Sequence, residues 1–449
     1  MKRVLTIAGS DSGGGAGIQA DLKTITILGS YGMSVITALT AQNTIGVQGV
    51  HPVPVAFIGQ QMDSVLSDIG ADAAKTGMLA NAEIVDAVAE GIKRHHVQPL
   101  VVDPVMVATS GDPLLSEDAV ETLKQTLLPL AHVVTPNLSE ACLLCGFPVR
   151  DIEEMREAAK RILAMGPQNV LIKGGHTEGE AVDLLFDGQS FQTFKARRID
   201  KRTTHGTGCT LSAALATFLS QGLSVADAVG EAKQFTTRAI SMGLEIGSGH
   251  GPTNPYAHIM VLKEREAVLQ GLKRALDRLV GHPMGGLIPE VRSNLAYALS
   301  GALGYQEVAA FPGRISQVGD QVIVCREPAF GASRHVARVV LSAMQQDPSF
   351  RSAMNIRYSR AILAACRDLN FRVASFDRRE ESREVKEQEG LSLEWGTRQA
   401  LRGQEAMPDL VFDEGDVGKE PMIRVLGRDP HEVVEKVIRI GKALKDRET

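Results

Sequence analysis

Cysteine is scarce in this sequence, and charge of neither sign is in strong excess. The five cysteines are odd in number and irregularly spaced, and Cys142 and Cys145 have no second pair with which to bind a metal. We therefore expect reduced thiols, because neither a disulfide framework nor a zinc site is indicated.

Long apolar runs are also missing. The N-terminal segment has none before Ser10 and Asp11, so it lacks the pattern of a secretory signal, and no later stretch is apolar enough to span a bilayer. The net charge of only −5 argues against general nucleic-acid binding. We expect a cytoplasmic protein with neither membrane nor nucleic-acid partners.

The length of 449 residues exceeds what one hydrophobic core usually fills, so at least two domains are expected. In the first part of the chain, strand and helix patterns alternate, which is typical of an α/β fold with a mostly parallel sheet covered on both faces. Helices are expected over residues 18–28, 82–95, 116–127, 153–165 and 211–222.

The most informative motif is Thr-Thr-His-Gly-Thr-Gly-Cys-Thr at residues 203–210, directly before the apolar run 211–219. Two glycines at the start of a helix let the backbone approach a ligand, and the free N–H groups there favour an anion. The same place stabilises a thiolate, so Cys209 is positioned to accept a proton or to attack at neutral pH. The motif alone leaves open a glycine-rich turn with a buried cysteine.

Three polar residues follow other strand patterns. Asp103 ends a buried strand, Glu140 lies in the first turn of a helix, and Lys173 ends a further strand. Taken singly, each has an ordinary structural explanation. Together the two carboxylates offer the hard oxygen donors that Mg2+ takes when it also holds phosphates, and Lys173 can neutralise charge on a phosphoryl group. The glycine-rich loop 8–17 is a weaker signal, because it matches neither nucleotide-binding fingerprint.

Six motifs carry a family resemblance. They are Ala-Gly-Ser-Asp-Ser-Gly-Gly-Gly-Ala-Gly-Ile-Gln-Ala-Asp at 8–21, Thr-Ala-Gln-Asn-Thr at 40–44, Lys-Thr-Gly-Met-Leu at 75–79, Val-Val-Asp-Pro-Val-Met at 101–106, Thr-Pro-Asn-Leu-Ser-Glu-Ala at 135–141 and Gly-Thr-Gly-Cys at 206–209. With them, residues 1–258 resemble the hydroxymethylpyrimidine and phosphomethylpyrimidine kinases of thiamine biosynthesis, within the ribokinase-like superfamily. Most ribokinase-like sugar kinases carry aspartate in place of Cys209, so this residue and Gln42 favour the pyrimidine kinases.

The resemblance implies a pocket in which Gln42 hydrogen-bonds the aminopyrimidine edge, lined also by Gly9 and Met78. Cys209 would take the proton of the hydroxymethyl group. The family phosphorylates first the hydroxyl and then the resulting monophosphate, which yields a pyrimidine methyl diphosphate.

The resemblance also implies how the nucleotide is held. Asp103 and Glu140 would organise Mg2+ and ATP, and Lys173 would contact the nucleotide phosphates. The anion hole over the migrating phosphoryl group would consist of the backbone N–H groups of Gly206, Thr207, Gly208 and Cys209.

A change in composition marks the domain boundary. Residues 1–260 contain 9 Arg and 10 Lys, whereas residues 261–449 contain 22 Arg and 7 Lys. Breaker clusters at 247–255 and 281–286 flank an amphipathic helix at about 261–280. We expect a kinase domain at 1–260, a helical linker at 261–285 and a second, smaller α/β domain at 286–449.

The second domain holds polar residues in turns. Arg314 follows a Pro-Gly turn, and His335 lies in the first turn of a helix, where the dipole lowers a histidine's pKa and favours the neutral ring. Two further clusters contain Asn355, Arg357 and Ser359, and Asp413, Asp416, Lys419 and Arg424. Arginine suits phosphate and carboxylate, so these residues indicate an anionic ligand. For the charged run 372–386, which includes Arg378 and Glu381, we favour a solvated surface.

Residues 286–446 resemble the archaeal-type thiamine-phosphate synthase domain, which is often fused behind this kinase. The motifs are Ile-Pro-Glu-Val-Arg-Ser-Asn-Leu at 288–295, Pro-Gly-Arg-Ile at 312–315, Glu-Pro-Ala-Phe-Gly-Ala-Ser-Arg-His-Val-Ala at 327–337, Ser-Ala-Met-Asn-Ile-Arg-Tyr-Ser at 352–359, Ala-Ser-Phe-Asp-Arg at 374–378 and Asp-Val-Gly-Lys-Glu-Pro-Met-Ile-Arg-Val-Leu-Gly at 416–427.

The resemblance implies condensation of the pyrimidine methyl diphosphate with hydroxyethylthiazole phosphate, assisted by Mg2+. Arg314 and His335 match the two positions that the family needs for activity. The further ligand contacts that we expect are Asn355, Arg357, Asp377, Asp416 and Lys419.

Two alternatives remain open. Similar domains sense thiamine phosphate in transcriptional regulators, so the second domain could bind this ligand without catalysis. The first domain could instead be a pyridoxal or sugar kinase, against which Gln42 and Cys209 argue. Kinases that resemble this one are often dimers, so we expect a homo-oligomer.

Overall fold

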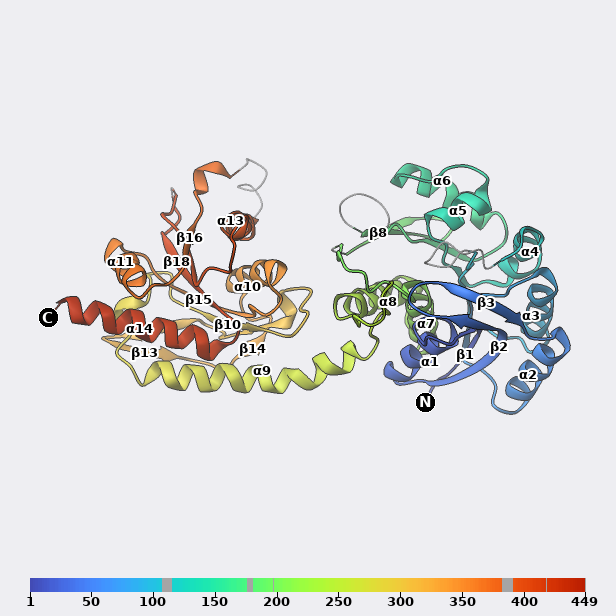
Figure 1. Ribbon diagram of the computed structural model, residues 1–449, viewed down its shortest axis with the longest axis horizontal. Coiled ribbons are helices and arrows are strands. Elements are labelled where there is room, and N and C mark those ends of the chain that lie inside the picture. The colour runs from blue at the N-terminus through green and yellow to red at the C-terminus, as the bar shows by residue number, and fades with distance from the viewer. Residues whose placement is uncertain (107–114, 176–180, 197, 382–390, 417, 449) are drawn as a thin grey trace. The chain divides into compact units, whose positions relative to one another are not determined.

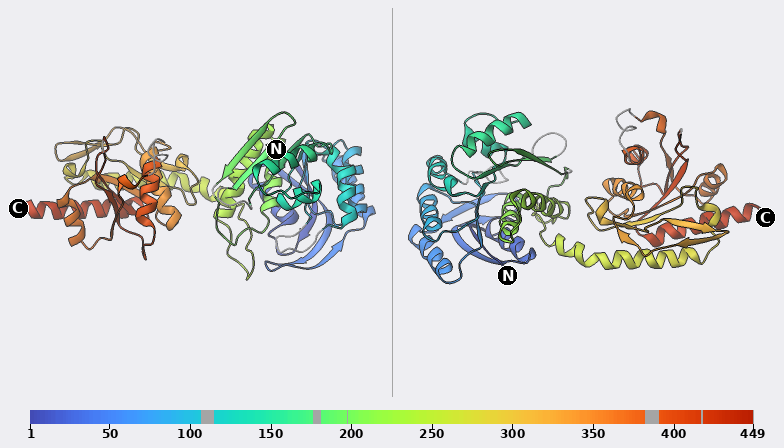
Figure 2. Two further views of the ribbon diagram at one scale, coloured as in Figure 1. Left: turned by 90° about the horizontal axis from the view of Figure 1, so that it is seen from above. Right: turned by 180° about the vertical axis from the view of Figure 1, so that it is seen from behind.

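The computed structural model describes residues 1–106, 115–175, 181–196, 198–381, 391–416 and 418–448. The chain forms two compact units, Met1–Ile259 and Met260–Thr449. Each is built on its own sheet with helices on both faces (Figures 1 and 2).

The N-terminal unit contains a nine-stranded sheet in the order β3-β2-β1-β4-β5-β6-β7-β8-β9. Strands β2, β1, β4, β5, β6 and β7 pair in parallel, and β3, β8 and β9 add antiparallel edges. The strands are β1 (Arg3–Asp11), β2 (Tyr31–Gln42), β3 (Val47–Pro52), β4 (Ala73–Thr76), β5 (Leu100–Val102), β6 (Val133–Val134), β7 (Asn169–Ile172), β8 (Ala181–Phe186) and β9 (Phe191–Ala196). The expected α/β fold with a mostly parallel sheet is therefore confirmed.

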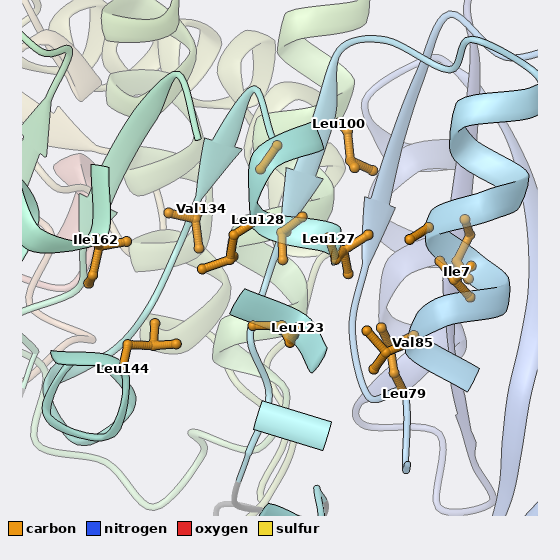
Figure 3. Close-up of a cluster of buried hydrophobic side chains, with 14 of the residues drawn as sticks. Ile7, Leu79, Val85, Leu100, Leu123, Leu127, Leu128, Val134, Leu144 and Ile162 are labelled. Carbon is orange, nitrogen blue, oxygen red and sulfur yellow. The ribbon is translucent and has the colours of Figure 1, made fainter. Parts of the chain in front are cut away.

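Strand alternation divides the core of this unit between the two faces of the sheet. Leu5 and Ile7 of β1 join the cluster on one face, whereas Val4 joins the cluster on the other, because successive side chains of a strand point to opposite sides. The first cluster packs against α2, α3, α5 and α6, and part of it is drawn in Figure 3. The second packs against α7 and α8, with Ile25 of α1.

The helices of the N-terminal unit mostly coincide with the expected ones. They are α1 (Gly17–Ile27), α2 (Val55–Asp68), α3 (Ala82–Arg94), α4 (Glu117–Thr122), α5 (Leu138–Cys145), α6 (Ile152–Leu163), α7 (Thr207–Ser220) and α8 (Val225–Ser241), with the helical turns η1 (Leu123–Leu127) and η2 (Leu128–Leu130). Helix α7 begins four residues before the expected position 211, because the glycine-containing motif itself forms its first turn. Helices α2 and α8 were not among the expected elements.

The C-terminal unit contains a seven-stranded sheet in the order β14-β11-β10-β15-β18-β17-β16 and a separate hairpin of β12 and β13. All of its described strand pairs are antiparallel except β16 with β17. The strands are β10 (Leu295–Ala298), β11 (Val308–Ala310), β12 (Ile315–Val318), β13 (Gln321–Val324), β14 (Ala329–Phe330), β15 (Ser352–Arg357), β16 (Val373–Ser375), β17 (Leu410–Asp413) and β18 (Met422–Gly427).

Helices cover both faces of this second sheet (Figure 1). On one face α10 and α13 enclose a core that includes Ala353, Val411 and Leu426. The helices of the unit are α9 (Ala257–Val280), α10 (Arg334–Gln346), α11 (Arg360–Asp368), α13 (Leu391–Leu401) and α14 (Pro430–Glu448), with the short turns η3 (Gly285–Leu287), η4 (Tyr305–Glu307) and η5 (Arg378–Glu380).

Helix α9 occupies the stretch that the sequence suggests as a linker, and it packs as part of the C-terminal unit. Glu264 accepts hydrogen bonds from the backbone N–H and the hydroxyl of Ser300, and it pairs with Arg351. Among the described residues, none of the helices has both the length and the apolar character needed to cross a membrane.

Candidate functional site

The first turn of α7 follows a glycine whose backbone no other residue could adopt without a clash. Gly206 has φ of 79°, and a Cβ at this position would lie 1.9 Å from the carbonyl oxygen of Gly15, so only glycine fits. A Cβ on Gly208 would lie 3.4 Å from Asp103 Oδ2 and 3.6 Å from Lys173 Nζ. The predicted anion hole therefore lies directly beside the predicted acid and the predicted lysine.

Asp103, Glu140 and Lys173 come together at the carboxyl ends of β5, β6 and β7. Lys173 Nζ lies 2.8 Å from Asp103 Oδ1 and 3.9 Å from Glu140 Oε2. Burial opposes ionisation of Asp103, but Lys173 and Lys75 hold its pKa below the usual value. Burial and then the charge of Asp103 raise the pKa of Glu140 to about 7, although Lys173 opposes the shift.

Glu140 also has the structural role that its position in the first turn allows. Its Oε2 accepts from the backbone N–H of Asn137 at 2.7 Å, and Asn137 accepts from the backbone N–H of Glu140 at 2.9 Å, which closes a capping box. One carboxylate thus caps α5 and faces the lysine of the site.

The donor set suits a magnesium ion that is held mainly by phosphates. Asp103 already accepts hydrogen bonds from Lys173, Thr135 and Ser212, so its oxygens are largely occupied. Mg2+ keeps several waters in such sites and takes few protein ligands. Glu140 and Asp103 are the residues that would hold such an ion, through its bound waters.

Cys209 differs from the sequence expectation of a stabilised thiolate. Burial raises the pKa of its thiol to about 12, although Lys75 and a hydrogen bond from the backbone of Gly17 oppose the shift. The position at the helix N-terminus is correct, but desolvation outweighs the dipole and the nearby cation. The thiol is therefore protonated at neutral pH.

Sequence reasoning missed a buried ion pair beside this thiol. Lys75 Nζ lies 3.0 Å from Asp21 Oδ2, both side chains are 0% exposed, and Thr6 donates a further hydrogen bond to Asp21. Burial opposes the charge of Lys75, but Asp21, and after it Cys209 and Asp103, hold its pKa above the usual value. Both residues lie inside quoted motifs, but their 54-residue separation gave no signal of a contact.

The residues expected to bind the pyrimidine lie near the same loop. Gly9 and Met78 adjoin, because a Cβ on Gly9 would lie 3.1 Å from Met78 Sδ. Gln42 Nε2 lies 3.4 Å from His205 Nε2, directly before the anion hole. His205 in turn contacts Asp11 Oδ2 at 2.9 Å, a partly buried link between the glycine-rich loop and α7 that sequence reasoning also missed.

In the C-terminal unit, Arg314 has a left-handed backbone with φ of 67°. Arg292 has the same φ, and the two residues flank the bridge between Ser293 and Ile315. This conformation costs a non-glycine residue free energy and is often retained at functional sites. The guanidinium of Arg314 is exposed and donates to the carbonyl oxygen of Val291.

His335 is the second residue of α10 and is accessible to solvent. Desolvation by the residues around it, followed by the charges of Arg424 and Arg314, lowers its pKa to about 4, with smaller contributions from Arg338 and Arg378. The expectation of a neutral ring is therefore confirmed, although desolvation and arginines provide the cause. The charge of Arg314 therefore acts on the ring of His335.

The other expected ligand contacts have varied surroundings. Asn355 holds the segment before β10 in place, because it accepts from the backbone N–H of Asn294 and donates to the carbonyl oxygen of Arg292. Arg357 is exposed at the end of β15. Asp377 caps η5 and pairs with Arg379. Asp416 and Lys419 pair through their backbones, and Lys419 Nζ lies 3.6 Å from Glu381.

The solvated-surface interpretation of residues 372–386 is wrong for two of them, and residues 382–386 lie outside the described ones. Arg378 and Glu381 are both only 6% exposed. Arg378 forms a two-point contact with buried Asp413, and Arg424 pairs with the same carboxylate at 2.7 Å. A charge run in sequence cannot indicate which of its members turns inward, and a carboxylate 35 residues away decides this case.

Residues 11–254 match the family model described as phosphomethylpyrimidine kinase, and residues 271–439 match the one described as thiamine-phosphate synthase ThiN. The chain is 53% identical over 251 residues to a hydroxymethylpyrimidine/phosphomethylpyrimidine kinase of Streptomyces coelicolor. The matched region covers 56% of the chain and 93% of that protein. It is also 53% identical over 262 residues to a thiamine biosynthesis bifunctional protein ThiED of Geobacter sulfurreducens. That match covers 58% of the chain and 53% of the relative, so the chain spans about half of the Geobacter protein.

Among solved structures, an ADP complex of Bacillus subtilis pyridoxal kinase is similar with a TM-score of 0.54 and 41% identity, over 57% of the chain and 98% of that protein. A pyridoxal kinase of Staphylococcus aureus in complex with AMP-PCP and pyridoxal has the same TM-score and 40% identity, over 57% of the chain and 94% of that protein. These kinases share the ribokinase-like fold of the N-terminal unit. The chain belongs to the phosphomethylpyrimidine kinase family and carries, after its kinase domain, a thiamine-phosphate synthase domain.

Proposed function

We propose that the N-terminal unit transfers the γ-phosphoryl group of ATP first to the hydroxyl of hydroxymethylpyrimidine and then to the monophosphate so formed. The observation that carries this proposal is the group of Lys173, Asp103 and Cys209 around the open first turn of α7. In each step the acceptor oxygen bonds to phosphorus, the bond from phosphorus to the bridging oxygen breaks, and ADP leaves.

The residues of the chain supply positioning and charge stabilisation. Backbone N–H groups at the start of α7 and the ammonium of Lys173 face the phosphoryl oxygens, where negative charge spreads in the transition state. Gln42, with Gly9 and Met78, holds the pyrimidine. Mg2+ would neutralise charge on the nucleotide phosphates, with Glu140 and Asp103 orienting its waters.

We assign Cys209 to contact with the attacking hydroxyl. Phosphoryl transfer through a loose transition state needs little proton removal before the new bond forms. A thiol whose pKa lies near 12 can hold the hydroxyl, while the minor thiolate form, favoured by Lys75, accepts the proton.

Kinase activity is tested by incubating the purified chain with ATP, Mg2+ and each acceptor in separate reactions. We expect phosphorylation of both hydroxymethylpyrimidine and its monophosphate. Pyridoxal is the second candidate acceptor, because the two pyridoxal kinases above share 40–41% identity with this unit. A kcat/KM for pyridoxal above those for both pyrimidines would overturn the assignment.

We further propose that the C-terminal unit condenses the pyrimidine methyl diphosphate with hydroxyethylthiazole phosphate to give thiamine phosphate. The thiazole nitrogen bonds to the pyrimidine methylene, the bond from that carbon to the diphosphate oxygen breaks, and its electron pair leaves with pyrophosphate. Arg314 and His335 support this proposal, since the charge of Arg314 acts on the ring of His335, and His335 lies at a helix N-terminus that has no side-chain cap. The alternative of a sensing domain does not require both residues.

The condensation test supplies both substrates and Mg2+ without ATP. We expect thiamine phosphate from the wild-type chain and none from Arg314→Ala. A chain with an active kinase unit and no condensation would reject the synthase proposal. Were both activities present, the first unit would make the substrate of the second at high local concentration.

We also propose that the protein is a cytoplasmic homo-oligomer. Light scattering tests the assembly, and cell fractionation tests the location.

A further inference from the structure

The ring of His205 contacts two side chains of the kinase unit through one nitrogen atom. His205 Nε2 lies 2.9 Å from Asp11 Oδ2 and 3.4 Å from Gln42 Nε2. The His205 side chain is 12% exposed and the Asp11 side chain is 2% exposed, so water competes little for the contact between them. A ring nitrogen of a neutral histidine is either a donor or an acceptor. The presence of a hydrogen on Nε2 therefore decides which end of the Gln42 amide can face the ring.

Asp11 requires a hydrogen on that nitrogen. Its Oδ2 accepts from the backbone N–H groups of Gly15 and Ala16, and its Oδ1 accepts from that of Gly13. Burial opposes ionisation of Asp11, but the hydrogen bond from His205 and those from the backbone hold its pKa below the usual value. A carboxylate can only accept, so His205 Nε2 must donate to it.

The donor on His205 in turn favours one orientation of the Gln42 amide. With Gln42 Nε2 toward the ring, two N–H donors face each other at 3.4 Å. A half-turn of the amide brings Oε1 to this place, where it accepts from His205. The same half-turn places Nε2 beside Thr40 Oγ1, which lies 3.1 Å from the other end of the amide. Thr40 can accept from Nε2 and use its own hydrogen for the carbonyl oxygen of Ser10, 3.0 Å away.

The main chain of Gln42 is held by the glycine-rich loop. Ser12 Oγ accepts from the backbone N–H of Gln42 at 2.8 Å and donates to its carbonyl oxygen at 2.9 Å. Asp11 and Thr40 are paired in the parallel register of β1 and β2. Because both polar backbone groups of Gln42 are engaged, rotation of its terminal amide is the smallest adjustment that satisfies His205.

The position of the anion hole points to the same orientation. In hydroxymethylpyrimidine the exocyclic amino group lies beside the carbon that bears the hydroxymethyl group, and ring atom N3 lies one position further along the edge. The hydroxymethyl group has to reach the anion hole, which begins at Gly206 directly after His205. The end of the Gln42 amide beside His205 therefore meets the amino group, which needs an acceptor. The other end meets N3, which needs a donor.

We infer that His205, with its Nε2–H fixed by Asp11, is a positioning residue that turns the amide oxygen of Gln42 toward the anion hole and makes the site select a 4-aminopyrimidine over a 4-oxopyrimidine. This inference rests on the proposed function of the N-terminal unit. A 4-oxopyrimidine presents a carbonyl oxygen and an N3–H. Against the oriented amide it would place acceptor on acceptor and donor on donor.

The test compares phosphorylation of hydroxymethylpyrimidine with that of its 4-oxo analogue by the full chain, with ATP and Mg2+. His205→Leu removes the donor, whereas His205→Gln retains an N–H donor near the position of Nε2. Thr40→Val removes the acceptor at the other end of the amide with little change of shape, and it carries the test if His205→Leu does not fold. His250→Leu is the matched control, because His250 is exposed and its backbone makes the described hydrogen bond to Thr44.

Two further measurements separate orientation from a structural role. Thermal unfolding checks that each variant is folded. Calorimetry measures the binding of each pyrimidine without ATP, so it reports the preference independently of phosphoryl transfer. A structural role alone would lower kcat/KM for both pyrimidines by the same factor and leave their ratio unchanged.

We expect the wild type and His250→Leu to favour the amino compound by about 100-fold or more in kcat/KM. His205→Leu and Thr40→Val are expected to lower this ratio by about tenfold or more, and His205→Gln to keep most of it. An unchanged ratio in folded His205→Leu, or a wild type that does not discriminate, would overturn the inference while leaving the kinase function in place. A wild type that binds neither pyrimidine would reject the proposed function, and the inference with it.

Discussion

Lys75 Nζ lies 3.1 and 3.0 Å from the two carboxylate oxygens of Asp21, and neither side chain is reached by solvent. Removing one partner leaves an uncompensated buried charge, so we expect Lys75→Met to lower the free energy of unfolding of the kinase unit by about 3–5 kcal/mol. Urea unfolding monitored by circular dichroism measures the change.

The double variant Asp21→Leu with Lys75→Met separates stability from function. Replacing both charges by apolar groups is expected to recover most of the lost stability. Kinase activity is expected to stay low, because Lys75 supplies positive charge beside Cys209 and Asp103. Full activity in a stable double variant would show that the pair has only a structural role.

The raised pKa of Cys209 leads to a prediction for how kinase activity depends on pH. Its pKa near 12 means that the thiolate fraction increases with pH throughout the range from 6 to 9, so kcat/KM is expected to rise across it. Cys209→Ala is expected to lower kcat/KM by about 10²-fold to 10⁴-fold and to flatten the profile. An unchanged slope in this variant would assign the titration to another group.

Glu140 links the stability of the kinase unit to pH in the opposite sense from an ordinary carboxylate. Burial raises its folded-state pKa from 4.5 to about 7, so the folded protein binds this proton more tightly than the unfolded chain does. The resulting contribution is fully present below pH 4.5 and is lost as pH rises to 7, with an upper limit of about 3 kcal/mol. We expect Glu140→Gln to remove this pH dependence in the absence of nucleotide.

The experiment compares melting temperatures of the wild type and Glu140→Gln at pH 5 and pH 8. The melting temperature of the variant, relative to that of the wild type, is expected to be higher at pH 8 than at pH 5, although the variant loses the charged half of the capping box. Equal differences at the two pH values would contradict the raised pKa.

Two substitutions of Arg314 can distinguish the cost of its left-handed backbone from the role of its side chain in condensation. Arg314→Gly and Arg314→Ala both remove the guanidinium, so both are expected to abolish condensation. Glycine tolerates φ of 67° without a Cβ penalty, so Arg314→Gly is expected to be more stable than Arg314→Ala by about 1 kcal/mol. Differential unfolding of the two variants measures this difference, and equal stabilities would mean that the turn relaxes at no cost.

The residues at strand ends and helix starts were predictable from sequence because their neighbours in the chain define these positions. Asp103, Glu140, Lys173 and Cys209 follow this rule, and parallel pairing of β4 to β7 brings the first three together. What was not predictable depends on contacts across the fold. Asp11 and His205 are separated by 194 residues, and no local pattern connects them.

Burial was the second limit of the sequence argument. Arg378 and Arg379 are adjacent and chemically identical, yet Arg378 is buried against Asp413 whereas the Arg379 side chain is 82% exposed. Likewise, the helix position of Cys209 predicts a lowered pKa, and only the packing around the thiol reverses the sign. Electrostatic expectations from sequence hold when local dipoles dominate and fail when desolvation does.

Because the pKa of His335 is about 4, its ring stays neutral between pH 5.5 and 8. We therefore expect that protonation of this residue does not lower the condensation rate in that pH range. Arg338→Gln removes one of the neighbouring positive charges and is expected to raise the pKa of His335 toward 6.5, with desolvation limiting the change. Nuclear magnetic resonance titration of the ring, assigned with His335→Gln, measures both values in the full chain. A wild-type pKa near 6.5 would reject the neutral ring that we propose for His335 and would require the imidazolium to act as another cation toward the departing pyrophosphate.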